Sequence, residues 1–270
     1  MPKVINRALI GCSVLLMWVS STPQSAQAED AISLGSRREL FADPTLVGAL
    51  SGDAKLKLHK PKPQEVVLVT GEPGEGNTCA YYTIFQDEKI YRMYYRGSHW
   101  DTKTKRATHP EVTCYAESTD GIHWTKPNLG LYSFNGSKKN NIVWNGIGTH
   151  CFAPFKDANP NVNPDAKYKA LSRGRPRGKK GLYAFQSTDG IHWKLMHSEP
   201  VITVGAFDSQ NLAFWDPARK LYVAYYRHFR NGRRDIMTCT SKDFLNWTKP
   251  EFLKITGSPQ QHLYTNAILV

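Results

Sequence analysis

The heptapeptide STDGIHW fills residues 118–124 and returns unchanged at residues 187–193. A divergent third copy, SKDFLNW, fills residues 241–247. Internal repeats are considered before any helix or strand is assigned, because an array of repeated units has a different architecture from a single irregular domain. The heptapeptide therefore marks the end of a unit that occurs three times.

Two further landmarks precede each copy. A run that starts with tyrosine and ends with arginine occurs at residues 91–96, 168–173 and 222–227. Further upstream, an apolar run ends in Phe-x-Asp, at residues 85–87, 155–157 and 214–216. The order is constant and only the lengths between landmarks vary, which indicates a repeated supersecondary unit with loop insertions.

The composition of the runs favours strands. Residues 80–85, 91–95 and 113–116 are short, aromatic and bounded by Gly, Asp, Asn or Lys. No helical stripe follows residue 40, and the dipeptides Asp120-Gly121, Asp189-Gly190 and Asn231-Gly232 are two-residue hairpin signals. Each unit predicts strand A ending at Phe-x-Asp, strand B ending at Arg, strand C leading into the heptapeptide, and strand D beginning at its Trp.

Four antiparallel strands at this period describe a blade of an all-β propeller. Strands A line the channel, so the heptapeptides lie in C–D turns on the face away from the A-strand starts. Turn chemistry and a packed Trp are sufficient reasons for them. Asp120 and Asp189 are therefore predicted to be structural.

The first 28 residues are typical of a secretion signal. Lys3 and Arg7 precede an apolar stretch at 8–19, and Ala26-Gln27-Ala28 is a cleavage site. We expect cleavage after Ala28 and a secreted or periplasmic chain with no membrane segment. With 40% hydrophobic residues and a net charge of +12, the chain is predicted to be globular rather than disordered.

The remainder divides by landmark. Residues 29–76 form a leading segment, with candidate strands at 39–43, 56–62 and 66–69, that is expected to supply a ring-closing outer strand. Blades are predicted at about 77–148, 149–206 and 207–259, and residues 260–270 begin strand A of a fourth blade. Three blades and one strand leave open edges, so we expect a fragment of a larger propeller. Cys79, Cys114, Cys151 and Cys239 fall on strands too far apart for bridging and are predicted to be buried thiols.

With the units placed, five segments resemble a known superfamily: residues 75–82, 93–100, 113–131, 205–216 and 247–250. The chain resembles the five-bladed β-propeller glycoside hydrolases of families 32, 43 and 68, and is similar to exported bacterial proteins described as glycosyl hydrolase family 32 N-terminal domain-like. The resemblance covers roughly residues 38–270. The Asn-Asp-Pro-Asn-Gly, Arg-Asp-Pro and Glu-Cys signatures are absent, so no catalytic acid is carried over by motif.

The resemblance implies a pocket at the top of the channel, where strands A begin and B–C loops lie. Glycoside hydrolysis needs an acid for the leaving oxygen and an opposing carboxylate. Asp208, just before strand A of the third unit, is the predicted carboxylate, with a turn-capping role as the alternative. Glu75, in a glycine-rich loop, or Glu111, at the head of a strand C, would supply the acid. Predicted substrate-binding residues are Asn77, Arg96, His99, His150, Arg173, Gln210, Asn211, Arg227 and His262.

Arg96, Arg173 and Arg227 end strand B in all three units, and the B–C loops add further Lys and Arg residues. The alternative to structural inter-blade pairing is a ring of donors that binds an anionic substrate, such as a sulfated or uronic-acid polysaccharide. Nucleic acid is a weaker candidate, because no nucleic-acid module is present and the chain is exported. No metal or cofactor spacing occurs.

Two functions remain open from the sequence: a secreted glycosidase acting by paired carboxylates, and a non-catalytic carbohydrate-binding propeller.

Overall fold

A computed structural model describes residues 33–35, 46–255 and 261–268. The chain divides into two compact units, Met1–Pro63 and Gln64–Val270, and all strands of the described residues belong to the second. No helix among the described residues is long and apolar enough to cross a membrane. The predicted strand at 39–43 lies outside the described residues.

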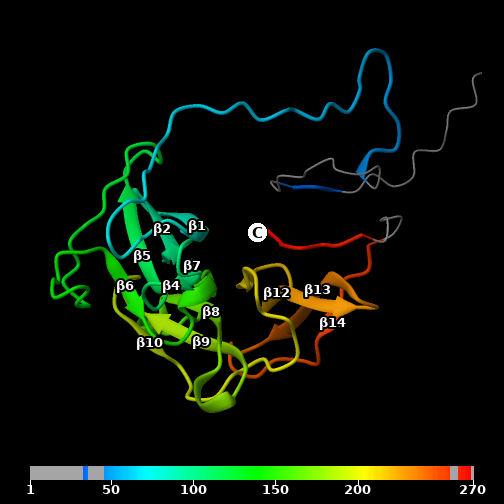
Figure 1. The fold of residues 1–270 in the computed structure, drawn as a ribbon. Helices are drawn as coiled ribbons and strands as arrows, with labels where there is room; N and C mark the ends of the chain where they lie inside the picture. Colours follow the sequence, from blue (N-terminus) through cyan, green and yellow to red (C-terminus); the bar gives the residue numbers. More distant parts are fainter. Residues whose placement is uncertain (1–32, 36–45, 256–260, 269–270) are drawn as a thin grey trace, which may run out of the picture. The chain divides into compact units, whose positions relative to one another are not determined.

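Three four-stranded sheets follow one another along the second unit (Figure 1). The first contains β1 (Ala80–Asp87), β2 (Ile90–Gly97), β5 (Val112–Ser118) and β6 (Ile142–Asn145), with a small hairpin of β3 (Trp100–Asp101) and β4 (Arg106–Ala107) inserted after β2. The second contains β7 (Ala153–Lys156), β8 (Tyr168–Gly174), β9 (Gly181–Ser187) and β10 (Trp193–Leu195). The third contains β11 (Leu212–Asp216), β12 (Leu221–Arg230), β13 (Arg233–Ser241) and β14 (Glu251–Phe252). Three short 3-10 helices lie in the segments before and between the strands of the second sheet: η2 (Thr149–Cys151) before β7, η3 (Pro164–Ala166) between β7 and β8, and η4 (Pro176–Gly178) between β8 and β9.

The three sheets are equivalent in topology and register. Every pairing is antiparallel, and the strands of each sheet neighbour one another in chain order. The landmark phenylalanines occupy one register position, because Phe85 pairs with Arg92, Phe155 with Lys169, and Phe214 with Val223. The prediction of an all-β propeller built from four-stranded antiparallel blades is confirmed. The five-bladed count and the blade boundaries stay predictions.

The first strands of the sheets, β1, β7 and β11, line an apolar channel of about 490 Å³. Ile84 and Phe85 of β1 face Phe155 of β7 and Phe214 of β11 across this space. Ile268, from the predicted strand A of a fourth blade, also lines it, although residues 261–268 form no strand. Strands A therefore lie at the axis, as the blade geometry requires.

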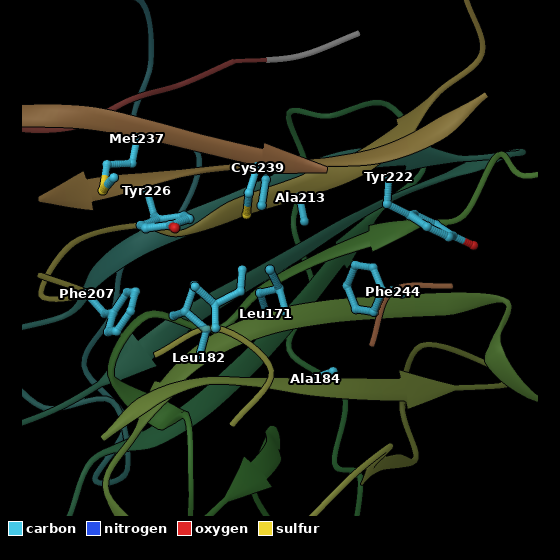
Figure 2. Packing of buried hydrophobic residues seen from close by; sticks show 12 residues of the cluster. Leu171, Leu182, Ala184, Phe207, Ala213, Tyr222, Tyr226, Met237, Cys239 and Phe244 are labelled. Carbon is cyan, nitrogen blue, oxygen red and sulfur yellow. The ribbon is translucent and has the colours of Figure 1, made fainter. Parts of the chain in front are cut away.

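The cores lie between successive sheets. Figure 2 shows Leu171 and Leu182 of the second sheet packed against Ala213, Tyr226 and Cys239 of the third. A second buried cluster joins the first sheet to the second through the aromatic side chains Tyr94, Tyr115, Tyr183, Phe185 and Trp193. Burial of large aromatic side chains between the sheets, with edge-to-face contacts such as that of Tyr94 with Trp193, holds neighbouring blades together. Three of the predicted thiols are buried and Cys79 is half-buried, all four as free cysteines.

The heptapeptide is a self-contained turn. Asp120 Oδ1 accepts hydrogen bonds from the backbone N–H of Ile122 and His123, and Trp124 Nε1 donates to the Gly121 carbonyl. The second and third copies repeat these contacts. Asp120 and Asp189 thus have the structural role that the sequence predicted. Asp189-Gly190 does not form the two-residue hairpin turn that the sequence predicted, because Ser187 pairs with Trp193 across a longer loop, and the first heptapeptide has the same turn contacts. Of the three predicted turns, Asn231-Gly232 forms the expected two-residue turn, between the paired residues Arg230 and Arg233.

Four strand predictions are wrong. The fourth strand of the first sheet begins at Ile142 and not at Trp124, and that of the third sheet begins at Glu251 and not at Trp247; only the isolated bridges Glu117–Thr125 and Ser241–Trp247 form near the two tryptophans. Residues 56–62 and 66–69 form no strand and are largely exposed. The apolar residues in these segments suggested strands, but no neighbouring strand among the described residues pairs with them.

The aspartate of Phe-x-Asp fastens each sheet to the next. Asp87 accepts hydrogen bonds from Arg92 of its own sheet and from Tyr168 and Lys156 of the second. Asp157 repeats the arrangement with Lys169 of its own sheet and Tyr222 of the third. The landmark is therefore an inter-blade clasp, in which a buried carboxylate is satisfied by cations and a tyrosine hydroxyl.

Replacing Asp87 with asparagine should lower the free energy of unfolding by about 2 kcal/mol at neutral pH, because charge-assisted hydrogen bonds to Lys156 and Arg92 are lost. Although burial opposes it, these bonds and that of Tyr168 lower the pKa of Asp87 to about 2. A carboxyl group whose pKa is lower in the folded protein than in the unfolded chain stabilises the fold at pH values above its pKa in the unfolded chain. The deficit should therefore persist above about pH 4 and vanish as the pH falls through about 2.

Denaturant unfolding across this pH range measures the effect. Glu88→Gln is the matched control, because Glu88 also contacts Lys156 but is 72% exposed and is expected to contribute little. An equal deficit in both variants would contradict the clasp.

Candidate functional site

A pocket of about 600 Å³ lies where strands B end and strands A begin. All three sheets contribute to it, which follows from the repeat, since equivalent strand ends lie on the same face. Its charged lining residues are mostly basic: Glu111, His150, Arg173, Arg175, Lys180, Asp208, Arg227 and Arg234. The structure thus brings together five predicted site residues that are widely separated in sequence: Glu111, His150, Arg173, Asp208 and Arg227.

His150 lies between the two carboxylates. Its Nδ1 is 3.0 Å from both carboxylate oxygens of Glu111, and its Nε2 is 3.1 Å from Asp208 Oδ1. Because a carboxylate only accepts hydrogen bonds, an imidazolium would donate to both groups at once. The predicted acid and the predicted carboxylate therefore face each other across an imidazole ring.

The three equivalent arginines, Arg96, Arg173 and Arg227, lie beside the row formed by Glu111, His150 and Asp208. Arg173 Nη1 is 3.0 Å and Arg227 Nη2 is 3.4 Å from the Asp208 carboxylate, while Arg96 Nη1 is 3.5 Å from Glu111 Oε1. Arg227 is 3% exposed, and its Nη1 is buried without a hydrogen-bond partner. Arg173 and Arg227 line the pocket, and Arg173 also pairs with a carboxylate of the next predicted blade, whereas the carboxylate partners of Arg96 and Arg227 lie in their own blades.

Both carboxylates are held in the ionised form. Burial opposes ionisation of Glu111, but the hydrogen bond and charge of His150, with Arg96 and Arg173, lower its pKa. Burial likewise opposes ionisation of Asp208, and the charges of Arg173, His150 and Arg227 lower its pKa. Neither group is a carboxylic acid ready to donate a proton near neutral pH.

A glycine positions the central histidine. Gly148 adopts φ 93° as the N-cap of η2, and a Cβ there would lie 2.8 Å from the Phe185 ring. Only glycine combines this left-handed conformation with so close an approach. The turn places His150 of η2 at the pocket wall, beside the strand ends that carry Arg96 and Arg173.

The sequence analysis missed Tyr81. Its backbone has φ 57°, at an irregularity in the β1–β2 register between Ala80 and Thr83. Its ring centroid is 5.3 Å from that of His150, and the Arg96 guanidinium lies 5.0 Å above the ring. Left-handed backbone is uncommon for an aromatic residue and accumulates at functional sites. An unremarkable tyrosine at the start of a strand gives no such signal in the sequence.

Glu75 lies apart from this cluster. Its side chain is fully buried and accepts hydrogen bonds from Lys126 Nζ at 2.8 Å, from Tyr95 Oη, and from the backbone N–H of Gly71 and Glu72. The glycine-rich loop is thus wrapped around the carboxylate rather than solvated. The structure does not bring Glu75 to the pocket.

The other predicted binding residues are dispersed. Asn77 holds the backbone of Trp100, and His99 lies beside Asn77 in a different, smaller pocket. Gln210 donates to Tyr82 O and Thr83 Oγ1 of the first sheet, and Asn211 is buried and donates to Phe207 O and Ser209 O. His262 Nδ1 accepts from the backbone N–H of Arg234, which lines the pocket.

Two cations on the pocket rim are available for a ligand. Arg175 and Lys180 line the pocket from the β8–β9 connection, and no ion pair to a described residue engages them. Within the described ranges, no group of three His, Cys, Asp or Glu side chains is suited to hold a metal ion. The pocket therefore offers cationic side chains, two ionised carboxylates and an imidazole.

Comparison with solved structures gives fold-level likenesses, whereas no protein-family model matches the chain. A β-fructofuranosidase from Schwanniomyces occidentalis complexed with fructosyl-erythritol is 14% identical, with 70% of this chain and 36% of that chain covered and a TM-score of 0.50. The same enzyme complexed with fructosylnystose gives 14% identity, coverage of 67% and 35%, and a TM-score of 0.48. A family 117 glycoside hydrolase from Zobellia galactanivorans gives 16% identity, coverage of 70% and 51%, and a TM-score of 0.47.

The chain therefore spans about a third to a half of the length of these proteins. The first likeness supports a shared propeller fold, the fold of the glycoside hydrolases that the sequence resembles. At such low identity the likeness concerns the fold alone, so chemistry has to be argued from the pocket.

Proposed function

We propose that this chain carries the substrate pocket of a secreted propeller enzyme that binds an anionic glycan and cleaves its glycosidic bonds. The observation that carries the proposal is the convergence of Arg173, Arg227, Glu111, His150 and Asp208 from three blades on one pocket. Arg173 and Arg227 lie near the ends of equivalent strands, and the connecting segments add Glu111, His150 and Asp208 beside them, where a substrate at the channel mouth would meet them.

The charge balance supports an anionic substrate. Arg173 is 41% exposed and already bound to Asp208, while Arg175 and Lys180 of the same rim have no ion pair among the described residues. Planar guanidinium groups suit sulfate and carboxylate, which accept two parallel hydrogen bonds. A sulfated or uronic-acid sugar would replace solvent around these cations.

The proposed cleavage uses Asp208 as the carboxylate that acts on the sugar. Its side chain is 57% exposed and ionised, so it is accessible to a substrate. Glu111 is 32% exposed and lies on the far side of His150. For these two groups to act as a conventional pair, the substrate would have to enter the space that the imidazole fills.

The second candidate is a carbohydrate-binding propeller without catalysis. The absence of the family 32 signatures and the lowered pKa values of both carboxylates favour it. Turnover of any glycan by the intact protein would rule it out, whereas binding without turnover would support it.

Sulfated and uronic glycans should bind more tightly than their neutral counterparts, and the difference should shrink as salt is raised. Replacing Arg173 with glutamine should weaken binding of the anionic glycan by about tenfold, the effect of one charge-assisted hydrogen bond. Calorimetric titration across a salt series measures both.

Arg219→Gln is the matched control, because Arg219 is exposed and paired with Asp216 in the β11–β12 turn, outside the pocket lining. Equal affinity for charged and neutral glycans would exclude an anionic substrate.

A further inference from the structure

We propose that His150 is the proton donor to the departing glycosidic oxygen, and that Glu111 positions it. This inference rests on the proposed cleavage function and assigns the acid that glycoside hydrolysis requires. It replaces the expectation that a glutamic acid fills this role.

The geometry singles out Nε2. Nδ1 is occupied by both oxygens of Glu111 at 3.0 Å, which fixes the ring plane, whereas Nε2 points at the exposed Asp208 at 3.1 Å. A glycosidic bond that enters between Nε2 and Asp208 would have a nitrogen donor on its oxygen and a carboxylate near its anomeric carbon. A separation of about 5–5.5 Å between acid and carboxylate is typical of retaining glycosidases, so the contact has to open modestly.

The alternatives in the pocket are less suited to donation. Glu111 and Asp208 are kept ionised by surrounding cations. Arginine does not release its proton in proteins. Burial raises the pKa of Tyr81, which makes it a weak acid. The imidazolium of His150, in contrast, can donate a proton in one step and, once neutral, accept a proton in the next.

The step balances as follows. The Nε2 proton passes to the glycosidic oxygen, the bond from this oxygen to the anomeric carbon breaks with its electron pair on oxygen, and an Asp208 oxygen bonds to the anomeric carbon. Neutral His150 then takes a proton from water, whose oxygen bonds to the anomeric carbon as the ester bond breaks and its electron pair returns to Asp208. No other reactant is consumed, and His150 and Asp208 end in their starting forms.

Surrounding elements hold the ring in this position. Tyr81 of β1 and Arg96 of β2 pack beside it, with Arg96 Nη1 3.4 Å from Nδ1. The strained backbone of Tyr81 is consistent with a ring held in place by this contact. The charged and titratable groups that face His150 or its carboxylate partners are Tyr81, Arg96, Glu111, Arg173, Asp208 and Arg227.

The test compares leaving groups. Nitrophenyl and methyl glycosides of glucuronic and galacturonic acid, in both anomers, are offered to the full chain. His150→Asn should lower kcat/KM for a methyl glycoside by about a hundredfold or more. The nitrophenyl glycoside should lose less than about tenfold, because nitrophenolate departs without being protonated.

His123→Asn is the control, because His123 lies in a heptapeptide turn outside the pocket lining. The third heptapeptide already carries an asparagine there, Asn246, whose side chain makes the same contact with Asp243, so both substrates should be cleaved as by the unmodified chain. Thermal unfolding and binding of an anionic glycan establish that the His150 variant is folded. Unchanged cleavage of the methyl glycoside by folded His150→Asn would overturn the inference alone, as would equal losses on both leaving groups. No cleavage of any probe by the unmodified chain would overturn it together with the proposed cleavage.

Discussion

Replacing Asp208 with asparagine is expected to lower kcat on a cleaved glycan by about 10⁴-fold, the upper end of what one positioned catalytic group contributes. Asparagine keeps the shape of the side chain but cannot bond to the anomeric carbon as a carboxylate does. Binding should change less than about tenfold, since the cationic rim remains and one negative charge is removed from it. Steady-state kinetics and calorimetric binding on the same glycan separate the two effects.

Asp216→Asn provides the comparison for this variant. Asp208 precedes strand β11, and Asp216 is the last residue of that strand, where it caps the β11–β12 turn and pairs with Arg219. It should leave kcat unchanged. Full turnover by Asp208→Asn would remove Asp208 from the mechanism, and an unmodified chain that binds but cleaves nothing would favour the binding protein.

The position of Asp208 was accessible from the sequence because it depends on the repeat. Once the landmark phenylalanines are aligned, the residues six positions before Phe214 and at the ends of strands B fall on one face, whatever the loops between them contain. The same argument brought Arg96, Arg173 and Arg227 together. Periodicity predicts these placements since equivalent positions in repeated units occupy equivalent places about the axis.

The contacts of His150 were not accessible in this way. Its partners Glu111 and Asp208 are 39 and 58 residues away in the chain and belong to different blades. Their proximity depends on how far each loop reaches, and the loops are where the repeat is not conserved between units. The conformation of Tyr81 is hidden for a related reason, because a register irregularity is set by the partner strand and not by the residue itself.

The first blade shows how insertions limit prediction. The repeat predicted that strand D begins at the heptapeptide tryptophan, as it does at Trp193 in the second unit. In the first unit, the chain leaves the sheet after a single bridge and returns only at Ile142. The turn chemistry of the heptapeptide is local and is therefore retained, whereas strand pairing is not local and is lost.

Replacing Glu75 with alanine is predicted to lower the free energy of unfolding by about 3–5 kcal/mol. The sequence predicted Glu75 as a candidate acid of the pocket, yet its carboxylate is fully buried and accepts hydrogen bonds from Lys126, Tyr95 and two backbone N–H groups. Removing it leaves the ammonium of Lys126, which is 20% exposed, without its carboxylate partner and with only the Val69 carbonyl as acceptor. The backbone N–H groups of Gly71 and Glu72 lose their acceptor in the same step.

The effect should depend on pH in a defined direction. Burial opposes ionisation of Glu75, but the bonds from Lys126, Tyr95 and Glu72 lower its pKa. A lowered pKa contributes stability above the normal range of glutamate and loses it as the pH falls below that range. The difference between the parent chain and Glu75→Ala should therefore be largest near neutrality and shrink in acid.

Denaturant unfolding with Glu72→Ala as control measures this difference, because Glu72 is exposed and contacts the same loop through its backbone N–H and C=O groups, which the substitution keeps. A structural carboxylate requires loss of stability in Glu75→Ala with turnover per folded molecule retained. If the variant were instead as stable as the control and inactive, Glu75 would return as the catalytic acid, and the role of His150 would have to be reconsidered. Replacing Glu75 should therefore reduce stability and not turnover, because its carboxylate is enclosed by the fold. Replacing His150 should reduce turnover and not folding, because its imidazole faces the pocket.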